Sequence, residues 1–442
     1  MSEVKSVARP IVSTIIPTHN RCDLLAEALA SVYAQEALGA AFDVEVLVVD
    51  DASTDATADV VRRWAGVRYV RLDRPAGPCA ARNAGLELAR GQFVAFLDDD
   101  DVWLPHKLRV QVPVLEGSPD VGVVYAQNTV QGAVGAMLWP DAALAPSGHV
   151  FSWFLLDDFV TMNAVVVRRD VFQVSGYFDE TVTAMEHYDM FLRAARHVAF
   201  RFMPVSVATC RISERGRWLT AIRSGAYRTA LSRAVERALD TLSPESVSDA
   251  FRVRVQTSVF ARVVYHEGSV RPPEEVRAYV AEMLDRWPAL LLQDLARNAL
   301  VLHARRVAAQ GTSPDAEVAA LCGVVAAAGQ RMPEGRAVVR ELLGWMWLAA
   351  AKEFWRRGGR YRRAGMGAAW TAWRCAPAVV GKEAVRKTAG GVWAGRASGR
   401  REAGAATTTE RGVPIHPGIA IPGPWAAARQ PVLGPGAPAG PE

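Results

Sequence analysis

The chain has 442 residues, half of them hydrophobic, and carries a formal net charge of +5. This length exceeds that of one ordinary hydrophobic core and predicts two or three domains. The charge is modest and its basic residues concentrate in the last third, which argues against a dedicated nucleic-acid-binding protein.

The cysteines and the apolar runs exclude two further classes of protein. Five cysteines lie far apart and form no C-x-x-C pair, which indicates reduced thiols instead of a disulfide or zinc framework. The amino terminus lacks the apolar region of a signal peptide, and the longest apolar run, from Leu342 to Ala351, is too short to span a bilayer. We therefore expect a cytoplasmic protein.

The first part of the chain repeats a strand-to-helix pattern. Short apolar runs that predict buried strands alternate with helical periodicity, and the predicted strands are 11–16, 44–51, 67–72 and 93–97. A helix at about 79–89 leads into the last of them. Such alternation predicts an α/β domain with a doubly wound, mostly parallel sheet and flanking helices.

The pattern continues beyond Pro105 and then changes. We predict a helix to about residue 115 and strands near 121–126 and 164–167, with a looser stretch rich in Gly and Ala between the two strands. Near Arg211 the α/β character fades.

From about residue 220 the periodicity is helical, and after Gly390 the chain becomes rich in Gly, Ala, Thr, Arg and Pro. We expect a catalytic domain over 1–215, an all-α accessory region over 216–390 and a low-complexity, disordered tail over 391–442.

Four consecutive aspartates, Asp98 to Asp101, follow the predicted strand at 93–97. In open α/β sheets, ligands bind outside the carboxyl ends of the strands. Several like charges in one turn are costly unless a cation or its phosphate ligand is present. A solvated acidic loop is the alternative, and the apolar Trp103-Leu104-Pro105 return disfavours it.

Four segments, in this order and spacing, resemble the family-2 glycosyltransferases of GT-A fold. They are STIIPTHNR, VEVLVVDDASTD, GPCAARNAGLELARGQFVAFLDDDDVWLP, and GYFDE followed by MEHYDMFLR. The resemblance covers residues 11 to about 211. It implies inverting transfer of a sugar from a nucleotide-diphosphate sugar to an acceptor hydroxyl, on a glycan, a lipid-linked acceptor or a small molecule, with a divalent metal.

The resemblance also implies a donor site. The turn that cradles the base and diphosphate would be formed by Pro17, Thr18, His19, Asn20 and Arg21. Asp51 would accept a hydrogen bond from the base, and Arg82 and Asn83 would line the site. A helix cap is the structural alternative for the acid.

The aspartate cluster matches the D-x-D signature of the family, with Asp98, Asp99 and Asp100 in its three positions. Carboxylate oxygens suit Mg²⁺ or Mn²⁺, which would neutralise the leaving diphosphate. We expect Asp100 to be the direct metal ligand, with Asp98 as the second candidate. Asp98 or Asp99 would face the donor ribose.

The expected catalytic base is where the sequence departs from the family. The usual Glu-Asp pair is replaced by Glu186 and His187. Either of them could take the acceptor proton, and Asp189 could orient the histidine. Alternatively, His187 only packs the helix and activity is lost. After this helix, Arg211, Arg215 and Arg217 replace a histidine and could hold the diphosphate by charge.

Aromatic residues lie beside arginines in the last third: Trp345, Trp347, Phe354, Trp355, Trp370 and Trp373 around RRGGRYRR. At these helical spacings core packing is the favoured interpretation, and peripheral contact with the inner face of a membrane is the alternative. Two rival functions remain. The departure at His187 favours an impaired module that binds nucleotide sugar or a partner, and the aromatic residues beside arginines favour a peripheral membrane adaptor.

Overall fold

The computed structural model describes residues 9–132, 135–213, 216–243, 247–310, 313–332 and 335–377. The chain forms two compact units that meet in sequence between Ser246 and Val247. The predicted tail, 391–442, lies outside the described residues. No helix in the described ranges is both long and apolar enough to cross a membrane.

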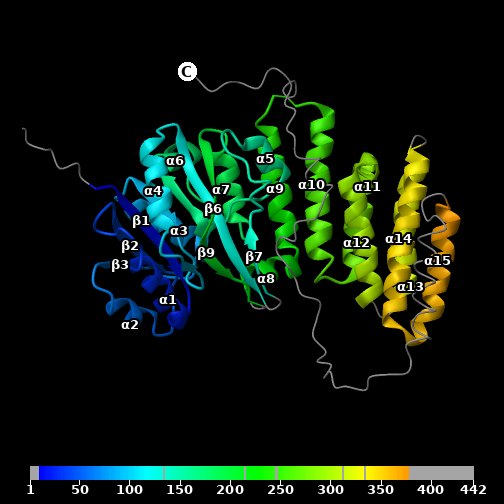
Figure 1. Ribbon diagram of the computed structural model, residues 1–442, viewed down its shortest axis with the longest axis horizontal. Helices are drawn as coiled ribbons and strands as arrows, with labels where there is room; N and C mark the ends of the chain where they lie inside the picture. The colour runs from blue at the N-terminus through cyan, green and yellow to red at the C-terminus, as the bar shows by residue number, and fades with distance from the viewer. Residues whose placement is uncertain are drawn as a thin grey trace, which may run out of the picture. The chain divides into compact units, whose positions relative to one another are not determined.

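The first unit is built on one sheet (Figure 1). Its described strands are β1 (Ile11–Thr18), β2 (Asp43–Asp50), β3 (Val67–Arg71), β4 (Phe93–Phe96), β5 (Val102–Trp103), β6 (Val121–Gly132), β7 (Gly135–Trp139), β8 (Val165–Arg168) and β9 (Ala199–Arg211). The order across the sheet is β3-β2-β1-β4-β8-β6-β9-β5, with β7 paired to β6.

The first four strands in this order are parallel, as are β6 and β9, whereas β5, β7 and β8 pair antiparallel with their neighbours. The doubly wound α/β class is therefore confirmed. The stretch predicted to be loose instead extends β6 and adds β7, because the hairpin pairs its backbone groups within the sheet. The long strand β9 was not predicted.

Helices follow the strands of this unit. They are α1 (Cys22–Tyr33), α2 (Thr57–Arg62), α3 (Gly77–Leu88), α4 (Lys107–Gly117), α5 (Phe151–Leu156), the 3₁₀ turn η1 (Met162–Ala164), α6 (Val171–Ser175), α7 (Glu186–Ala194), α8 (Arg217–Ser224) and α9 (Ala226–Asp240). The last two helices, which the sequence assigned to the accessory region, belong to the first unit.

Alternate side chains of β1 face opposite layers of helices. Ile16 joins a core cluster with residues of α1 and α4. Ile15 faces α3, where a Cβ on Gly85 would lie 2.5 Å from its Cγ2 atom. Since successive side chains of a strand point to opposite faces, helices cover both faces of the sheet.

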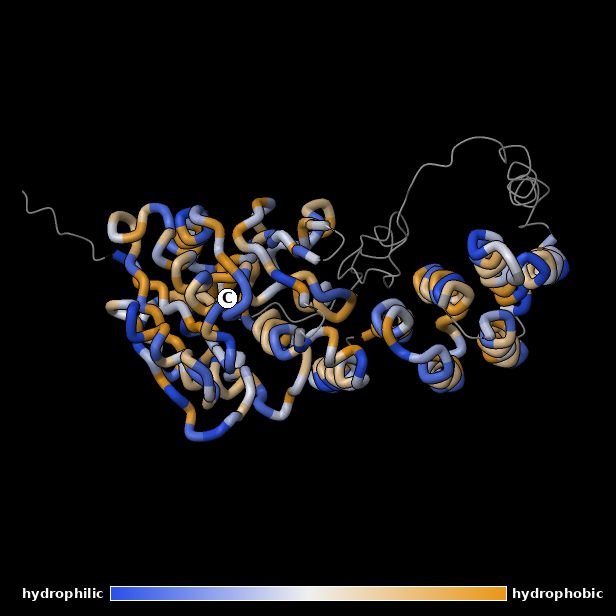
Figure 2. The backbone as a smooth tube through the Cα atoms, turned by 90° about the horizontal axis from the view of Figure 1, so that it is seen from below, coloured by the Kyte–Doolittle hydropathy of each residue, from blue (hydrophilic) through white to orange (hydrophobic). Residues whose placement is uncertain are grey.

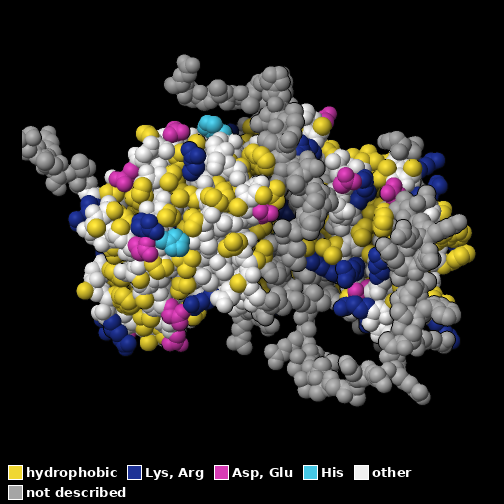
Figure 3. Space-filling model, in the orientation of Figure 1, with side chains coloured by type: hydrophobic (Ala, Val, Ile, Leu, Met, Phe, Trp, Pro, Cys, Tyr) yellow, Lys and Arg dark blue, Asp and Glu magenta, His cyan; other side chains and the backbone are white. Residues whose placement is uncertain are grey.

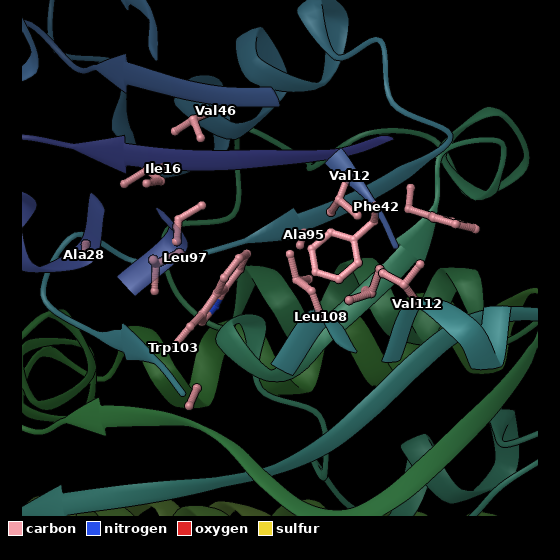
Figure 4. Close-up of a cluster of buried hydrophobic side chains, with 14 of the residues drawn as sticks. Val12, Ile16, Ala28, Phe42, Val46, Ala95, Leu97, Trp103, Leu108 and Val112 are labelled. Atoms are coloured by element: carbon pink, nitrogen blue, oxygen red, sulfur yellow. The ribbon is translucent and has the colours of Figure 1, made fainter. Parts of the chain in front are cut away.

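The core cluster holds the sheet to its helices (Figure 4). The ring of Phe42 lies beside Val12 and Ala95 of the strands and beside Leu108 and Val112 of α4, and all five are buried. Truncating a buried phenylalanine to alanine typically costs about 3–5 kcal/mol. This packing fixes the strand ends from which the candidate site is built.

The second unit is all helical in its described part. It contains α10 (Asp249–Glu267), α11 (Pro273–Arg286), η3 (Pro288–Leu292), α12 (Asp294–Gln310), α13 (Pro314–Gln330), α14 (Arg336–Arg357), η5 (Gly359–Tyr361) and α15 (Arg362–Cys375). Figure 2 views these helices nearly end-on, side by side. Two of these helices, α11 and α13, begin at a proline, where the missing amide hydrogen costs nothing.

The aromatic run of α14 and α15 divides between core and surface. Phe354 is fully buried, whereas Trp345, Trp370 and Trp373 are exposed. The prediction of core packing is therefore confirmed for Phe354 and wrong for these three tryptophans.

Candidate functional site

The first and third motifs meet at the carboxyl ends of the parallel strands. Thr18, the last residue of β1, lies in register with Asp50 of β2, and the amide of Leu97 bonds to the carbonyl of Ile15. The Thr18 hydroxyl donates to an Asp99 carboxylate oxygen at 2.8 Å. The sheet therefore brings residues 81 positions apart into one site.

The PTHNR turn is joined to the loop after β2. Pro17 lies within β1, opposite Val49. His19 Nδ1 lies 2.6 Å from the backbone oxygen of Asp51. Asn20 accepts a hydrogen bond of 2.7 Å from the Thr54 amide. These contacts fix the turn in which the sequence placed the donor's base and diphosphate.

Strained backbone marks three of the four motif segments. Asn20, Ala52 and Met185 have positive φ values of 53°, 57° and 57°. Such left-handed conformations cost roughly 1–3 kcal/mol for residues other than glycine and persist where surrounding structure enforces them. All three lie next to predicted site residues, so the tertiary structure imposes the shape of these turns.

Asp51 caps the loop that leads into α3. Its buried carboxylate accepts the amides of Ala76 at 2.6 Å and Gly77 at 2.9 Å. Asp51 therefore has the helix-capping role that was the structural alternative for this residue. Each carboxylate oxygen has a second lone pair, so binding of a base by the same group stays compatible with the cap.

Arg82 and Asn83 of α3 connect the site to the last motif. Arg82 is almost fully buried and lies 2.7 Å from Asp98 and 3.1 Å from Glu186. Burial opposes its charge, but these two carboxylates outweigh burial and raise the pKa of Arg82. Asn83 exchanges hydrogen bonds of 2.9 Å with the backbone of Phe178, so its amide is fully engaged in holding the GYFDE segment.

Three of the four aspartates have arginine partners. Asp98 pairs with Arg82, and Arg21 reaches both Asp99 and Asp100, at 2.8 Å and 2.6 Å. Two arginines thus face a run of four carboxylates. The PTHNR turn, through Arg21, supplies half of this positive charge.

Asp101 is buried behind the cluster. It accepts a hydrogen bond of 2.7 Å from the Arg211 amide and a short one from the side chain of Asn163. Asn163 also accepts the Asp98 amide at 2.8 Å. This asparagine ties the cluster to η1, just before β8, and no motif in the sequence pointed to it.

The cluster retains uncompensated negative charge. Burial and the charge of Asp98 raise the pKa of Asp100 to about 6, although Arg21 opposes the shift. Carboxylates held in this condition suit a hard divalent cation. Among the described residues, however, no group of three or more His, Cys, Asp or Glu side chains is arranged to hold a metal ion. The residue types therefore fit a cation, and the present pairing engages Asp98 and Asp100 with arginines.

Glu186 is a paired structural anion. It lies 3.1 Å from Arg82 and 3.0 Å from Arg217. Burial alone would raise its pKa, but Arg217 and Arg82 outweigh burial and lower the pKa of Glu186 to about 2. A carboxylate with so low a pKa is a poor proton acceptor.

His187 has a different environment. Its Nε2 atom lies 3.0 Å from a carboxylate oxygen of Asp158, and its side chain is 24% exposed. Burial opposes the imidazolium, yet the charge of Asp158 raises the pKa of His187 above 6.5. The histidine is thus oriented and made more basic by an acid 29 residues earlier.

Asp189 does not orient His187. It lies 3.1 Å from Arg193 and 2.8 Å from Arg237 of α9, whereas Asp158 holds the histidine. Asp158 follows the apolar run of α5 in a pair of acids, which is the signal that singled out the other acidic residues. Arg237 lies on an amphipathic helix without such a signal.

Two of the three arginines after α7 have carboxylate partners. Arg217 pairs with Glu186, and Arg211 lies 2.6 Å from Glu27. Arg215 lies outside the described residues. A diphosphate would have to compete for these two guanidinium groups.

Comparison with known proteins assigns a family to the first part of the chain. Residues 13–182 match the model of glycosyl transferase family 2, a range that contains most of the predicted site. This part of the chain is a family 2 glycosyltransferase domain. Its mixed sheet, with helices on both faces, agrees with the α/β class that the resemblance implied.

Curated relatives support the glycosyltransferase domain over its first part. The succinoglycan biosynthesis protein ExoO of Rhizobium meliloti is 43% identical over 102 residues, which is 23% of this chain and 28% of that protein. The putative teichuronic acid biosynthesis glycosyltransferase TuaG of Bacillus subtilis is 37% identical over 108 residues, or 24% and 41% of the two chains. The chain thus spans less than half of the length of these relatives.

Among solved structures, the mannosyltransferase PcManGT from Pyrobaculum calidifontis, in complex with GDP-Man and Mn²⁺, is 22% identical with a TM-score of 0.47. That alignment covers 80% of this chain and 89% of PcManGT.

Proposed function

We propose that the domain transfers a sugar, with inversion, from a nucleotide-diphosphate sugar to an acceptor hydroxyl, and that His187 held by Asp158 is the base. The observation that carries this proposal is the contrast between neighbours. Glu186 is locked by two arginines with a pKa of about 2, whereas His187 is partly exposed, oriented by a carboxylate and raised in pKa.

In the proposed step, the acceptor oxygen attacks the anomeric carbon while its proton passes to the imidazole. The bond between the anomeric carbon and the phosphate oxygen breaks, and the nucleoside diphosphate leaves with that electron pair. Asp158 stabilises the imidazolium that forms, as an oriented carboxylate does beside a histidine base.

The donor would lie against the carboxyl ends of β1, β2 and β4. The PTHNR turn and Asp51 would receive the nucleotide, and Arg21 would exchange its carboxylate partners for the diphosphate. One guanidinium group can donate two parallel hydrogen bonds to phosphate oxygens. The diphosphate would therefore replace the carboxylates as the anionic partner of Arg21.

Asp100 and Asp98 would hold a divalent cation. When bound, Mg²⁺ or Mn²⁺ would neutralise charge on the leaving diphosphate. Their carboxylates fit because Asp100 bears uncompensated negative charge, as its pKa of about 6 indicates. Arg82 would hold Asp98 from behind while the cation occupies its other oxygen.

The acceptor belongs to the proposal only as a class, namely a hydroxyl on a glycan, a lipid-linked acceptor or a small molecule. The expected cytoplasmic location is likewise part of the proposal. The relatives named for succinoglycan and teichuronic acid synthesis favour a glycan among these acceptors.

The test is a panel of sugar nucleotides with and without Mn²⁺. The melting temperature of the purified protein is measured with each donor. Release of nucleoside diphosphate is measured in parallel, in unheated mixtures of the same composition. A donor at 100 times its Kd should stabilise the folded state by about 2.7 kcal/mol and raise the melting temperature. If no donor raises the melting temperature and none is cleaved, the proposal is wrong.

A further inference from the structure

The last described helix, α15, presents an apolar and basic face to the surface. Met366, Trp370 and Trp373 are 65%, 60% and 45% exposed, at spacings of four and three residues that place them on one face of the helix. The Trp370 and Trp373 rings stack with their centroids 5.0 Å apart. Soluble proteins rarely expose large apolar side chains together without a binding role.

The opposite face of α15 is fixed against α14. Ala372 is fully buried in a cluster with Leu348, and a Cβ on Gly365 would lie 2.8 Å from the Trp355 ring. Small residues therefore let the two helices approach closely. The helix cannot turn its tryptophans inward without losing this packing.

Charge beside the apolar face is positive. Arg362 and Arg363 are exposed at the start of α15, Arg374 is exposed in its last turn, and the helix contains no acidic residue. Over residues 336–377 the sequence has nine Lys or Arg and two Asp or Glu. One of the two acids, Glu353, is buried and paired with arginines. Figure 3 shows hydrophobic and basic side chains side by side at the edge of the second unit where α15 lies.

We infer that this face of α15, defined by Arg362, Arg363, Met366, Trp370 and Trp373, binds the surface of an anionic phospholipid bilayer. Tryptophan rings suit the headgroup level, where the apolar body and the polar N–H are both satisfied. Arginines beside them attract anionic lipid. The inference does not depend on the proposed transfer reaction.

Charge argues against the other occupants of this face. In a two-fold contact between two copies, the basic face would meet itself and its arginines would repel. Residues 378–442 carry eight Lys or Arg against four Asp or Glu, so this segment has the same sign as α15. An anionic surface complements the charge of this face, whereas a second copy and the segment 378–442 do not.

The test is flotation of the full chain with vesicles. One set is phosphatidylcholine alone, and the other is an equimolar mixture with phosphatidylglycerol. We expect binding to the mixed vesicles, weakened by salt, and little binding to phosphatidylcholine. The variant Arg362→Gln with Arg363→Gln should lower the partition coefficient roughly 20- to 30-fold, the usual worth of two arginines at an anionic surface. Trp370→Ala with Trp373→Ala should lower it at least about tenfold through lost apolar contact.

The matched control is Arg62→Gln with Arg63→Gln, which removes an equal charge from an adjacent exposed pair on the first unit. It should bind like the wild type. Equal binding by the control and the α15 arginine variant, or failure of the wild type to float, overturns the inference. A dimer in solution that the tryptophan variant dissociates would assign the face to a second copy and also overturn it.

Discussion

The carboxyl edge of the sheet and the outer face of α15 are both unusual in which side chains they bury and which they expose. At the sheet edge, charged groups such as Arg82 and Glu186 are buried and paired. On α15, tryptophans are exposed beside arginines. Buried charge and exposed apolar groups are both costly and both informative, because folding alone favours neither. The proposed chemistry and the proposed membrane contact therefore rest on different physical signals in one chain.

The largest effect should come from the aspartate cluster. Asp100→Asn is expected to abolish transfer and remove the metal dependence of donor binding, because it deletes a charge where the cation would lie. The measurement is transfer rate and donor-induced melting shift, each with Mn²⁺ and with chelator. Full activity of this variant, or of the wild type in excess chelator, would break the metal assignment.

The next effect concerns the proposed base. His187→Ala should slow transfer roughly 10²- to 10⁴-fold, the usual worth of a positioned base, while the donor still raises the melting temperature. His187→Asp restores the residue type expected from the family and should retain more activity than alanine. An alanine variant as fast as the wild type would place proton transfer elsewhere.

Glu186→Gln tests whether Glu186, which precedes His187 in the sequence, has a structural role. Removing one partner of a buried ion pair typically costs about 3–5 kcal/mol. Since about 1 kcal/mol shifts the melting temperature by about 2–4 °C in a unit of this size, we expect a fall of roughly 6–20 °C. Arg82 keeps Asp98 as a partner, which favours the lower part of that range. An unchanged melting temperature with lost activity would instead indicate that Glu186 acts on the acceptor.

Asp158→Asn should move the pH dependence of transfer. The rate requires neutral imidazole, so it falls as the pH drops through the pKa of His187, which Asp158 raises above 6.5. Removing that carboxylate lowers the pKa, so the fall should occur at lower pH, and lost orientation should slow the plateau rate about tenfold or more. A profile identical to that of the wild type would exclude Asp158 as a positioning residue.

The smallest effect should come from the exposed face. Trp370→Ala with Trp373→Ala should lower the free energy of unfolding by less than Glu186→Gln does, since the two side chains are 60% and 45% exposed and remove no buried charge partner. Transfer to a dissolved acceptor should not change. A large fall in melting temperature would show that these rings stabilise the fold, and the contrast with the sheet edge would then disappear.

Local pattern in the sequence was enough for most strands, most helices and the acids at the strand ends. Short apolar runs identify buried strands, and the residues that follow them fall at one edge because parallel strands end together. The same reasoning located Asp51, Asp98 and Asp100. It missed β9 and the β6–β7 hairpin, where alternation is interrupted and pairing decides the structure.

Partners and exposure were decided only by the tertiary structure. Glu186 and His187 are adjacent in sequence, yet one meets Arg82 and Arg217 and the other meets Asp158, so their pKa values move in opposite directions. Helical spacing favoured a core position for Trp370, and only the packing of α15 on α14 shows that this side chain lies at the surface. The reason is physical: a pKa and a buried area depend on groups distant in sequence, which a local pattern does not contain.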